Sequence, residues 1–389
     1  MSAEEAAATA EESVEEVVDE SLIDDEGLFH MQESALTYFG ADFDVRGLVQ
    51  RLNDGDIIVP RFDPDESDGA TLSGFQRRRV WNKPRMEKFI ETLLLGWPVP
   101  SIFMVLDTDQ RYLVLDGQQR LTALQSFYDG QYPDGKEFRL VNVAQHLQGS
   151  TYETLGADSK RRLNNTFIQA TVIEPRGEDG PESVYRLFDR LNSGGVSLTA
   201  QEIRVALFLG PVIHWIRDLN TDDNWRKLYG AHSPRLKDHE LILRALAMEE
   251  VMLKIEGQWD DDALRLEVYK PPMSDCLNSY LAKNRDLKNI DKDALTEAFS
   301  ESCKLLFQAA DRDGLRFNNR INAAHVDAVL SSLMWLHLNE ELPKKRAVSK
   351  ALQDLRGNEK YVEYVTQSTS HRENVLGRLQ LALAALGGK

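Results

Sequence analysis

Cysteine is scarce in this sequence, and long apolar runs are missing. Cys276 and Cys303 are the two cysteines among 389 residues, and neither lies in a CxxC or paired Cys/His spacing. This scarcity excludes a disulfide framework and a conventional zinc site. No apolar run approaches the roughly 20 residues that span a membrane, and the N-terminus has no basic start followed by an apolar stretch. We therefore expect a cytoplasmic protein without a membrane partner.

Basic residues are missing from the N-terminal part of the chain. Of the 63 acidic residues, 14 lie in residues 1–45, where no Lys or Arg occurs, so 49 acids remain against 46 bases. The net charge of −17 is therefore a property of the N-terminal segment. Residues 1–28 are acidic and poor in large apolar groups, which predicts a disordered tail. Such a tail either solubilises the chain or competes with nucleic acid for a basic site.

The most informative stretch is Asp116-Gly117-Gln118-Gln119-Arg120. It follows the apolar run at 112–115 and precedes a helix-like run at 121–128. This order predicts a strand that turns directly into a helix, which leaves free amides at the helix start. Those amides and the positive end of the helix dipole favour an anion.

Three residues of this motif suit phosphate chemistry. Gly117 can take a backbone angle that bulkier residues resist. Arg120 offers a planar fork of donors that matches phosphate, and Asp116 offers a carboxylate for Mg²⁺ or water. The alternative interpretation is a tight turn in which Asp116 and Arg120 simply pair.

Two further motifs flank this turn in the sequence. Upstream lies the run Phe75-Gln76-Arg77-Arg78-Arg79-Val80-Trp81, and downstream lies Arg190-Leu191-Asn192-Ser193-Gly194-Gly195. The order of the three motifs resembles the N-terminal domain of GmrSD-type modification-dependent restriction proteins, which is related to the ParB/sulfiredoxin superfamily. The resemblance covers roughly residues 46–208 and continues more weakly into the helical remainder.

The resemblance implies that the turn binds a nucleoside triphosphate or a nucleic-acid phosphate. Carried over to this sequence, Asp116 and Arg120 become the catalytic pair, with Asp116 as the metal or water ligand and Arg120 as the phosphate clamp. The other residues implied in phosphate or nucleotide binding are Gln76, Arg77, Gly117, Gln118, Gln119, Arg190, Asn192, Gly194 and Gly195.

Several of these residues have alternative interpretations. Arg78 and Arg79 depart from the family pattern, and they either add phosphate affinity or form an exposed basic face. Trp81 either packs under the loop or stacks on a base. The glycine pair at 194–195 either lets the backbone approach a ligand or forms a helix end and turn. Thr199-Ala200-Gln201-Glu202 predicts a capping box at the start of the next helix.

The chain is long enough for two folded units after the tail. Around the central motif we predict a helix from Pro84 to Leu95, strands at 101–106, 111–115 and 167–173, and helices at 118–128 and 181–191. The fold class is α+β. A ParB/sulfiredoxin-like mixed unit at 29–208 is followed by an all-helical unit at 209–389.

These observations give a first hypothesis for function. GmrSD-type proteins usually pair this domain with an HNH-type nuclease domain, for which this sequence shows no pattern. We therefore expect a nucleoside-triphosphate-binding sensor or regulator of a DNA-restriction or anti-phage defence system. It would use Mg²⁺, with hydrolysis left open, and would act with DNA or a separate nuclease chain. The alternatives are a non-enzymatic DNA-phosphate-binding or protein-interaction module, and a weak ParB-like nuclease.

Overall fold

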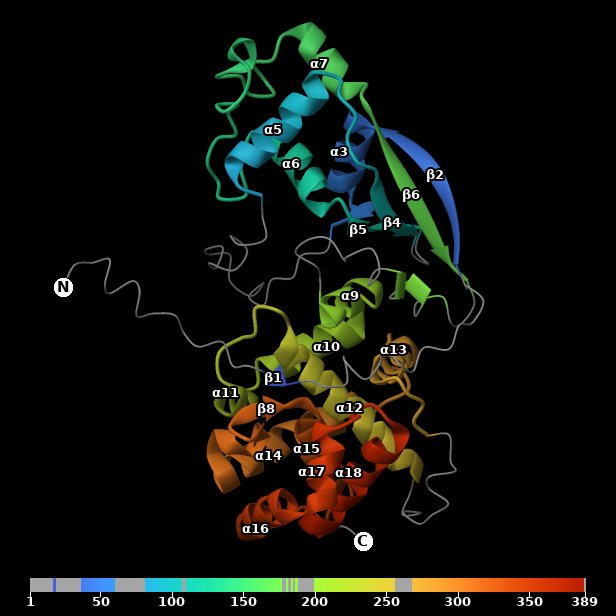
Figure 1. Ribbon diagram of the computed structural model, residues 1–389, viewed down its shortest axis with the longest axis vertical. Coiled ribbons are helices and arrows are strands. Elements are labelled where there is room, and N and C mark those ends of the chain that lie inside the picture. The colour runs from blue at the N-terminus through green and yellow to red at the C-terminus, as the bar shows by residue number, and fades with distance from the viewer. Residues whose placement is uncertain are drawn as a thin grey trace, which may run out of the picture. The chain divides into compact units, whose positions relative to one another are not determined.

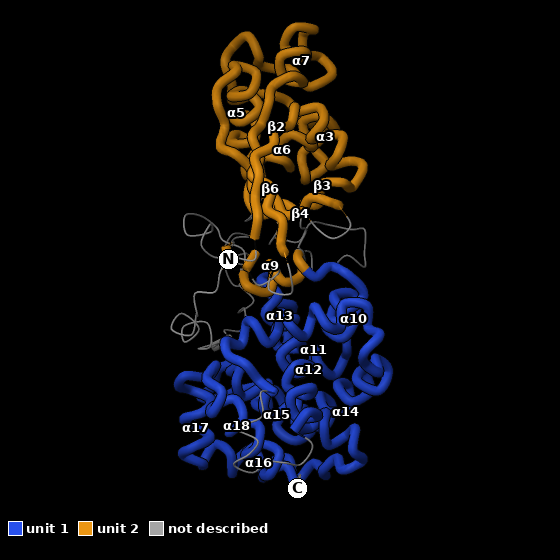
Figure 2. The backbone as a smooth tube through the Cα atoms, turned by 90° about the vertical axis from the view of Figure 1, so that its right-hand side faces the viewer, with its two compact units in different colours: residues 1–31, 208–389 blue, residues 32–207 orange. Residues whose placement is uncertain are grey.

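The chain contains two compact units. The computed structural model describes residues 17–18, 36–59, 81–106, 110–176, 180, 183–184, 186–187, 199–255 and 268–387. One unit spans Gln32–Leu207, and the other combines Met1–Met31 with Phe208–Lys389 (Figure 2). The first unit is mixed α/β and the second is mainly helical, so the predicted α+β class is confirmed. Within the described residues, none of the helices combines the length and apolarity needed to cross a membrane.

A five-stranded sheet organises the first unit, in the order β2-β6-β4-β5-β3 (Figure 1). The strands are β2 (Leu36–Asp44), β3 (Ile57–Ile58), β4 (Ile102–Leu106), β5 (Tyr112–Asp116) and β6 (Phe167–Pro175). The β2–β6 and β4–β5 pairs are antiparallel, whereas β4–β6 and β3–β5 are parallel. The strands predicted at 101–106, 111–115 and 167–173 are confirmed.

Four helices of this unit share one core with the sheet. They are α3 (Val45–Asp54), α5 (Lys83–Leu94), α6 (Gln118–Tyr128) and α7 (Ala157–Asn164). Leu48, Ile90, Leu121 and Val172 lie in this core and are almost fully buried. The predicted helices from Pro84 and over 118–128 are confirmed, whereas the helix predicted at 181–191 falls largely outside the described residues.

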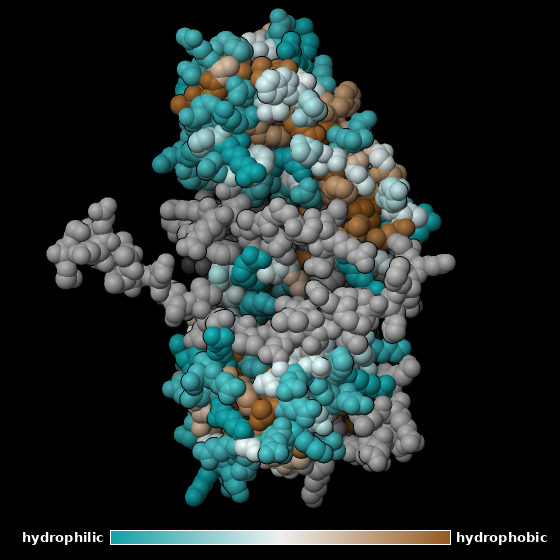
Figure 3. Space-filling view, in the orientation of Figure 1, coloured by the Kyte–Doolittle hydropathy of each residue, from teal (hydrophilic) through white to brown (hydrophobic). Residues whose placement is uncertain are grey.

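A smaller core covers the other sheet face. Val105, Leu113 and Ile173 of the strands meet Ile203 of α9 (Ala200–Leu207) there. Apolar side chains also remain on the surface of this unit, and Figure 3 shows brown patches among its mainly hydrophilic atoms. In the part of this unit that the structure describes, the exposed large apolar residues are Tyr38, Phe39, Trp97, Val141 and Phe167.

The second unit consists of helices around a small sheet. Its helices are α10 (Pro211–Asn220), α11 (Asp223–Tyr229), α12 (Lys237–Ile255), α13 (Met273–Lys283), α14 (Lys292–Ala310), α15 (Ala323–Leu338), α16 (Lys345–Gly357), α17 (Glu359–Thr366) and α18 (Arg372–Leu386). The sheet has the order β1-β8-β7, with β1 (Val17–Val18), β7 (Arg316–Phe317) and β8 (Arg320–Asn322). This sheet was not predicted from the sequence.

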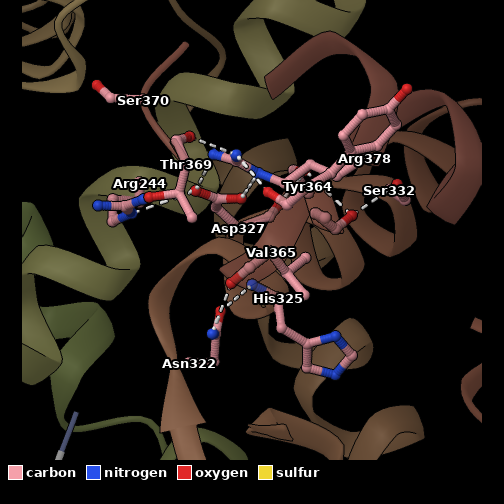
Figure 4. Close-up of polar contacts among 12 residues, drawn as sticks. Arg244, Asn322, His325, Asp327, Ser332, Tyr364, Val365, Thr369, Ser370 and Arg378 are labelled. Carbon is pink, nitrogen blue, oxygen red and sulfur yellow. Dashed lines mark hydrogen bonds and ion pairs between the residues drawn. The ribbon is translucent and has the colours of Figure 1, made fainter. Parts of the chain in front are cut away.

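A buried ion-pair network ties three of these helices together (Figure 4). Asp327 of α15 accepts hydrogen bonds from Arg244 Nη2 of α12 at 2.9 Å and from Arg378 Nε of α18 at 3.0 Å. The three side chains are at most 1% exposed. Arg378 Nη1 also donates to the carbonyl of Thr369. Because these groups are removed from water, their mutual pairing sets the packing of α12, α15 and α18.

Candidate functional site

The candidate site is the turn at which β5 becomes α6. Gly117 precedes α6 with φ 99° and ψ 6°, a left-handed conformation that favours glycine. A Cβ atom at this position would lie 2.5 Å from Cγ2 of Ile102. Glycine is therefore required here both by the backbone angle and by the close approach of β4. The predicted strand–turn–helix is confirmed.

The N-terminus of α6 has no side-chain cap among the described residues. Its first internal hydrogen bond joins Leu121 N to Gly117 O at 3.0 Å. The amides of residues 118–120 precede that bond, at the positive end of the helix. This arrangement gives the turn a concentration of positive partial charge next to the end of β5.

Arg120 is built into the fold of the turn. Its Nη1 donates to the carbonyls of Pro100 and Ser101, in the latter case at 3.0 Å. Its Nη2 donates to Asp116 Oδ2 at 2.6 Å. Three of the five guanidinium donors therefore have protein acceptors. The pairing of Asp116 with Arg120, which the alternative interpretation requires, is present. Arg120 also contributes a positive charge that these hydrogen bonds hold in place at the turn.

Asp116 differs from its partner in exposure. Its side chain is 58% exposed, whereas that of Arg120 is 9% exposed. The described residues include no cluster of three or more His, Cys, Asp and Glu that could hold a metal ion. Mg²⁺ usually keeps several waters and binds one or two carboxylates together with substrate phosphates. Asp116 is therefore the carboxylate at this turn that a metal ion arriving with phosphate could reach.

The two glutamines of the motif make contacts that fix the turn. Gln119 Oε1 accepts a hydrogen bond of 2.7 Å from the backbone N–H of Trp81. Gln118 Nε2 donates to the Val114 carbonyl at 3.4 Å. The sequence did not predict the link to Trp81, because a backbone donor 38 residues away leaves no pattern in the residue types.

Trp81 packs against neighbouring side chains. Its ring meets Phe89 edge-on with 5.6 Å between centroids, and the Arg85 guanidinium lies 4.7 Å from the ring centre. Trp81 also contacts the main core of the unit. The packing interpretation of Trp81 is confirmed, and base stacking stays a prediction.

The upstream motif lies outside the described residues, at Gln76, Arg77, Arg78 and Arg79. Trp81, the last residue of this run, is described and is bonded to Gln119. The convergence of Gln76 and Arg77 with the turn stays a prediction.

The downstream motif also lies outside the described residues, at Arg190, Asn192, Gly194 and Gly195. The chain is described again from Thr199, where the predicted capping box is confirmed. Thr199 N donates to Glu202 Oε2 at 2.6 Å, and Glu202 N donates to Thr199 Oγ1 at 3.3 Å. Glu202 is therefore a capping residue of α9.

Comparison with known proteins identifies the domain. Residues 52–209 match the family model described as the N-terminal domain of GmrSD restriction endonuclease. The matched region contains the β5–α6 turn and both flanking motifs, so the resemblance seen in the motifs is confirmed. Residues 52–209 are therefore similar to the N-terminal domain of this restriction endonuclease family. No curated protein matches the chain.

Proposed function

We propose that the β5–α6 turn binds the phosphates of a nucleoside triphosphate together with Mg²⁺. The chain would use this binding to sense or regulate a DNA-restriction or anti-phage defence system. The observation that carries the proposal is the uncapped start of α6 behind Gly117, with the exposed Asp116 carboxylate beside it. Helix N-termini of this kind are established anion sites because their amides and dipole both favour negative charge.

The phosphate oxygens would be held by backbone amides of the turn. Gly117 lacks a Cβ and adopts the left-handed conformation, so the chain can bend around an anion there. The guanidinium of Arg120 adds positive charge from behind the turn, fixed by the carbonyls of residues 100–101. In this arrangement Arg120 orders the turn as well as attracting phosphate.

Asp116 would hold Mg²⁺ together with phosphate oxygens and water. If the nucleotide is hydrolysed, the same carboxylate would position the attacking water. The flanking motifs would complete the site, with Gln76 and Arg77 on the phosphates and Asn192 on the base or ribose. Arg190, Gly194 and Gly195 belong to the same proposed contact. The partner of the chain would be DNA or a separate nuclease chain, and any nuclease activity would belong to that separate chain.

Titration calorimetry of the full chain with ATP, GTP, CTP and UTP, with and without Mg²⁺, tests this proposal. We expect at least one nucleotide to bind in a Mg²⁺-dependent manner. Asp116→Asn should weaken Mg²⁺-dependent binding by about tenfold or more. Asp129→Asn is the matched control, because it removes an exposed carboxylate at the opposite end of the same helix.

The outcomes separate the hypotheses. Phosphate release that disappears in Asp116→Ala supports hydrolysis. Absence of binding by all four nucleotides, or equal binding by Asp116→Asn and Asp129→Asn, overturns the proposal. If nucleotides fail and DNA binds with a steep salt dependence, the non-enzymatic phosphate-binding alternative holds instead.

A further inference from the structure

The small sheet of the helical unit contains a strand from the far N-terminal segment. Val17–Val18 pairs in parallel with β8, with Val17 opposite Ile321 and Val18 opposite Asn322 (Figure 1). On its other side β8 pairs with β7 in a tight hairpin. Asn318 and Asn319 form its turn with φ 53° and 65°, which are angles typical of two-residue hairpins. β1 therefore covers the edge of β8 that the hairpin leaves open.

An uncovered edge of this kind carries unpaired backbone groups that recruit other strands. Ile321 is fully buried and Asn322 is 6% exposed, so β8 is part of the core of the unit. A two-stranded hairpin alone is only marginally stable in water. A third strand on β8 satisfies its outer backbone groups and reinforces the hairpin.

The residues around the two strands carry opposite charges. Residues 11–26 contain nine acids and no Lys or Arg, and Val17–Val18 is the only pair of adjacent β-branched residues among them. The hairpin carries Arg316 and Arg320, both of which have interacting partners. Arg356 Nη2 lies next to it, donating to the carbonyls of Asp313 and Arg316. Residues 311–320 contain three arginines and two acids, Asp311 and Asp313, so this stretch has a net positive charge.

We propose that β8 is the docking site of the chain's own acidic N-terminal segment. Backbone pairing of Val17–Val18 sets the register, and carboxylates beside this pair neutralise the arginines of the hairpin. Acidic residues flank Val17–Val18 on both sides in the sequence, so carboxylates and the hairpin arginines are available to each other once the strand has paired.

The paired strand is short, so its docking on β8 is weak. Two residues form few backbone hydrogen bonds, so the pairing depends on the high effective concentration that a covalent tether supplies. Arg320 is exposed, so its attraction to the carboxylates of this segment is screened by salt. The N-terminal segment is therefore a displaceable strand, released at high ionic strength.

Hydrogen–deuterium exchange of the full chain tests the proposal. Proline has no backbone N–H and disrupts strand pairing. We expect Val17→Pro/Val18→Pro to accelerate exchange in residues 320–322 by about tenfold or more. The control Ala7→Pro/Ala8→Pro places the same change in the same segment but away from the paired residues, and should leave exchange unaltered. Equal exchange in wild type and Val17→Pro/Val18→Pro overturns the proposal.

A charge swap tests the electrostatic part. Glu16→Arg and Arg320→Glu should each accelerate exchange in residues 320–322, and the double variant should restore protection. Failure of the double variant to restore it removes the electrostatic part of the proposal.

Chain concentration identifies the source of the strand. Protection that is independent of concentration over about two orders of magnitude supports docking within one chain. Protection that rises with concentration assigns the strand to a second copy of the chain and overturns intrachain docking.

Discussion

Arg120 Nη2 lies 2.6 Å from Asp116 Oδ2, in an ion pair whose arginine is 9% exposed and whose aspartate is 58% exposed. We therefore assign Arg120 a structural role and Asp116 a role in ligand binding. The arginine donates hydrogen bonds to the backbone carbonyls of Pro100 and Ser101 and so fixes this part of the chain. The carboxylate reaches solvent at the end of β5, where a ligand can approach it.

The first prediction separates these two roles by substitution. Arg120→Lys should lower the free energy of unfolding by about 2–3 kcal/mol, because an ammonium cannot reproduce the planar fork that serves two carbonyls and a carboxylate. Asp116→Asn should cost less than about 1 kcal/mol, because an exposed ion pair contributes little. Urea denaturation of both variants measures the difference. An equal loss in the two variants would contradict this division.

The second prediction concerns Gly117. Gly117→Ala should destabilise the first unit by about 2–4 kcal/mol, because the left-handed conformation and the contact with Ile102 both oppose a Cβ. Gly130→Ala is the matched control, because Gly130 has φ 74° and no atom within 4 Å of an added Cβ. The control should cost only about 1–2 kcal/mol for the backbone term. Thermal unfolding of the two variants isolates the packing term at Gly117.

Local patterns predicted most of the elements around the turn. The helix at 118–128 was predicted without error, because an Asp-Gly turn and an apolar periodicity are encoded in neighbouring residues. Strand β2 was not predicted, since its pairing with β6 joins residues more than 120 positions apart. The strand at Val17–Val18 was missed for the same reason, inside a segment whose composition predicts disorder.

The chemistry of the turn was predictable only in part. The motif indicated which residue types would gather, and it left open whether Arg120 would pair with Asp116 or face a phosphate. The carbonyls that bind Arg120 belong to residues 100–101, and backbone acceptors have no residue signature. The positions of Gln76 and Asn192 lie outside the described residues, so their convergence with the turn stays a prediction.

The third prediction concerns Glu87, a carboxylate of α5 that is 2% exposed. It accepts hydrogen bonds from the backbone N–H groups of Val141 and Asn142 at 2.9 and 2.6 Å, and from the Tyr132 hydroxyl at 2.9 Å. Glu87→Gln would replace one acceptor oxygen with an NH₂ group, which is itself a donor and cannot accept these hydrogen bonds. We expect a loss of about 2–4 kcal/mol and faster hydrogen exchange at residues 141–142. Glu91→Gln is the control, because Glu91 is more exposed and, among the described residues, its carboxylate accepts from Ala144 N alone.

The fourth prediction concerns the buried network of Asp327 (Figure 4). Asp327→Asn removes the negative charge that Arg244 and Arg378 share, while both arginines stay buried. We expect the free energy of unfolding of the helical unit to fall by about 3–5 kcal/mol. Urea denaturation followed by helical circular dichroism measures this loss. A change below about 1 kcal/mol would show that the carbonyls of Tyr364 and Thr369 are sufficient to balance Arg378.

The fifth prediction is a pH dependence that originates at Glu249 of α12. Burial, and then the neighbouring Glu250, raise the pKa of Glu249 from 4.5 to about 7. Between pH 4.5 and about pH 7, the Glu249 carboxyl is ionised in the unfolded chain but protonated in the folded protein. The stability contributed by Glu249 is therefore complete below the unfolded pKa and is lost as pH rises through about 7. The pKa difference corresponds to about 3 kcal/mol.

Glu249→Gln should consequently stabilise the helical unit at about pH 8.5 by up to about 3 kcal/mol and have little effect at about pH 4.

Burial lowers the pKa of His239 to about 4 and that of His325 to about 3 in the same unit. These histidines act in the opposite direction, because the unfolded chain takes up their protons first and stability falls as pH drops below about 6.5. They are present in both proteins, so the difference between variant and wild type isolates Glu249. Glu250→Gln gives a contrasting variant, although it also removes the charge that helps to raise the pKa of Glu249. Burial alone would raise the pKa of Glu250, but hydrogen bonds from Lys254 and Lys283 outweigh burial and lower it, so this substitution should destabilise the unit at about pH 8.5. Urea midpoints at both pH values measure these effects, and a Glu249→Gln shift of the same size at both would contradict the assignment.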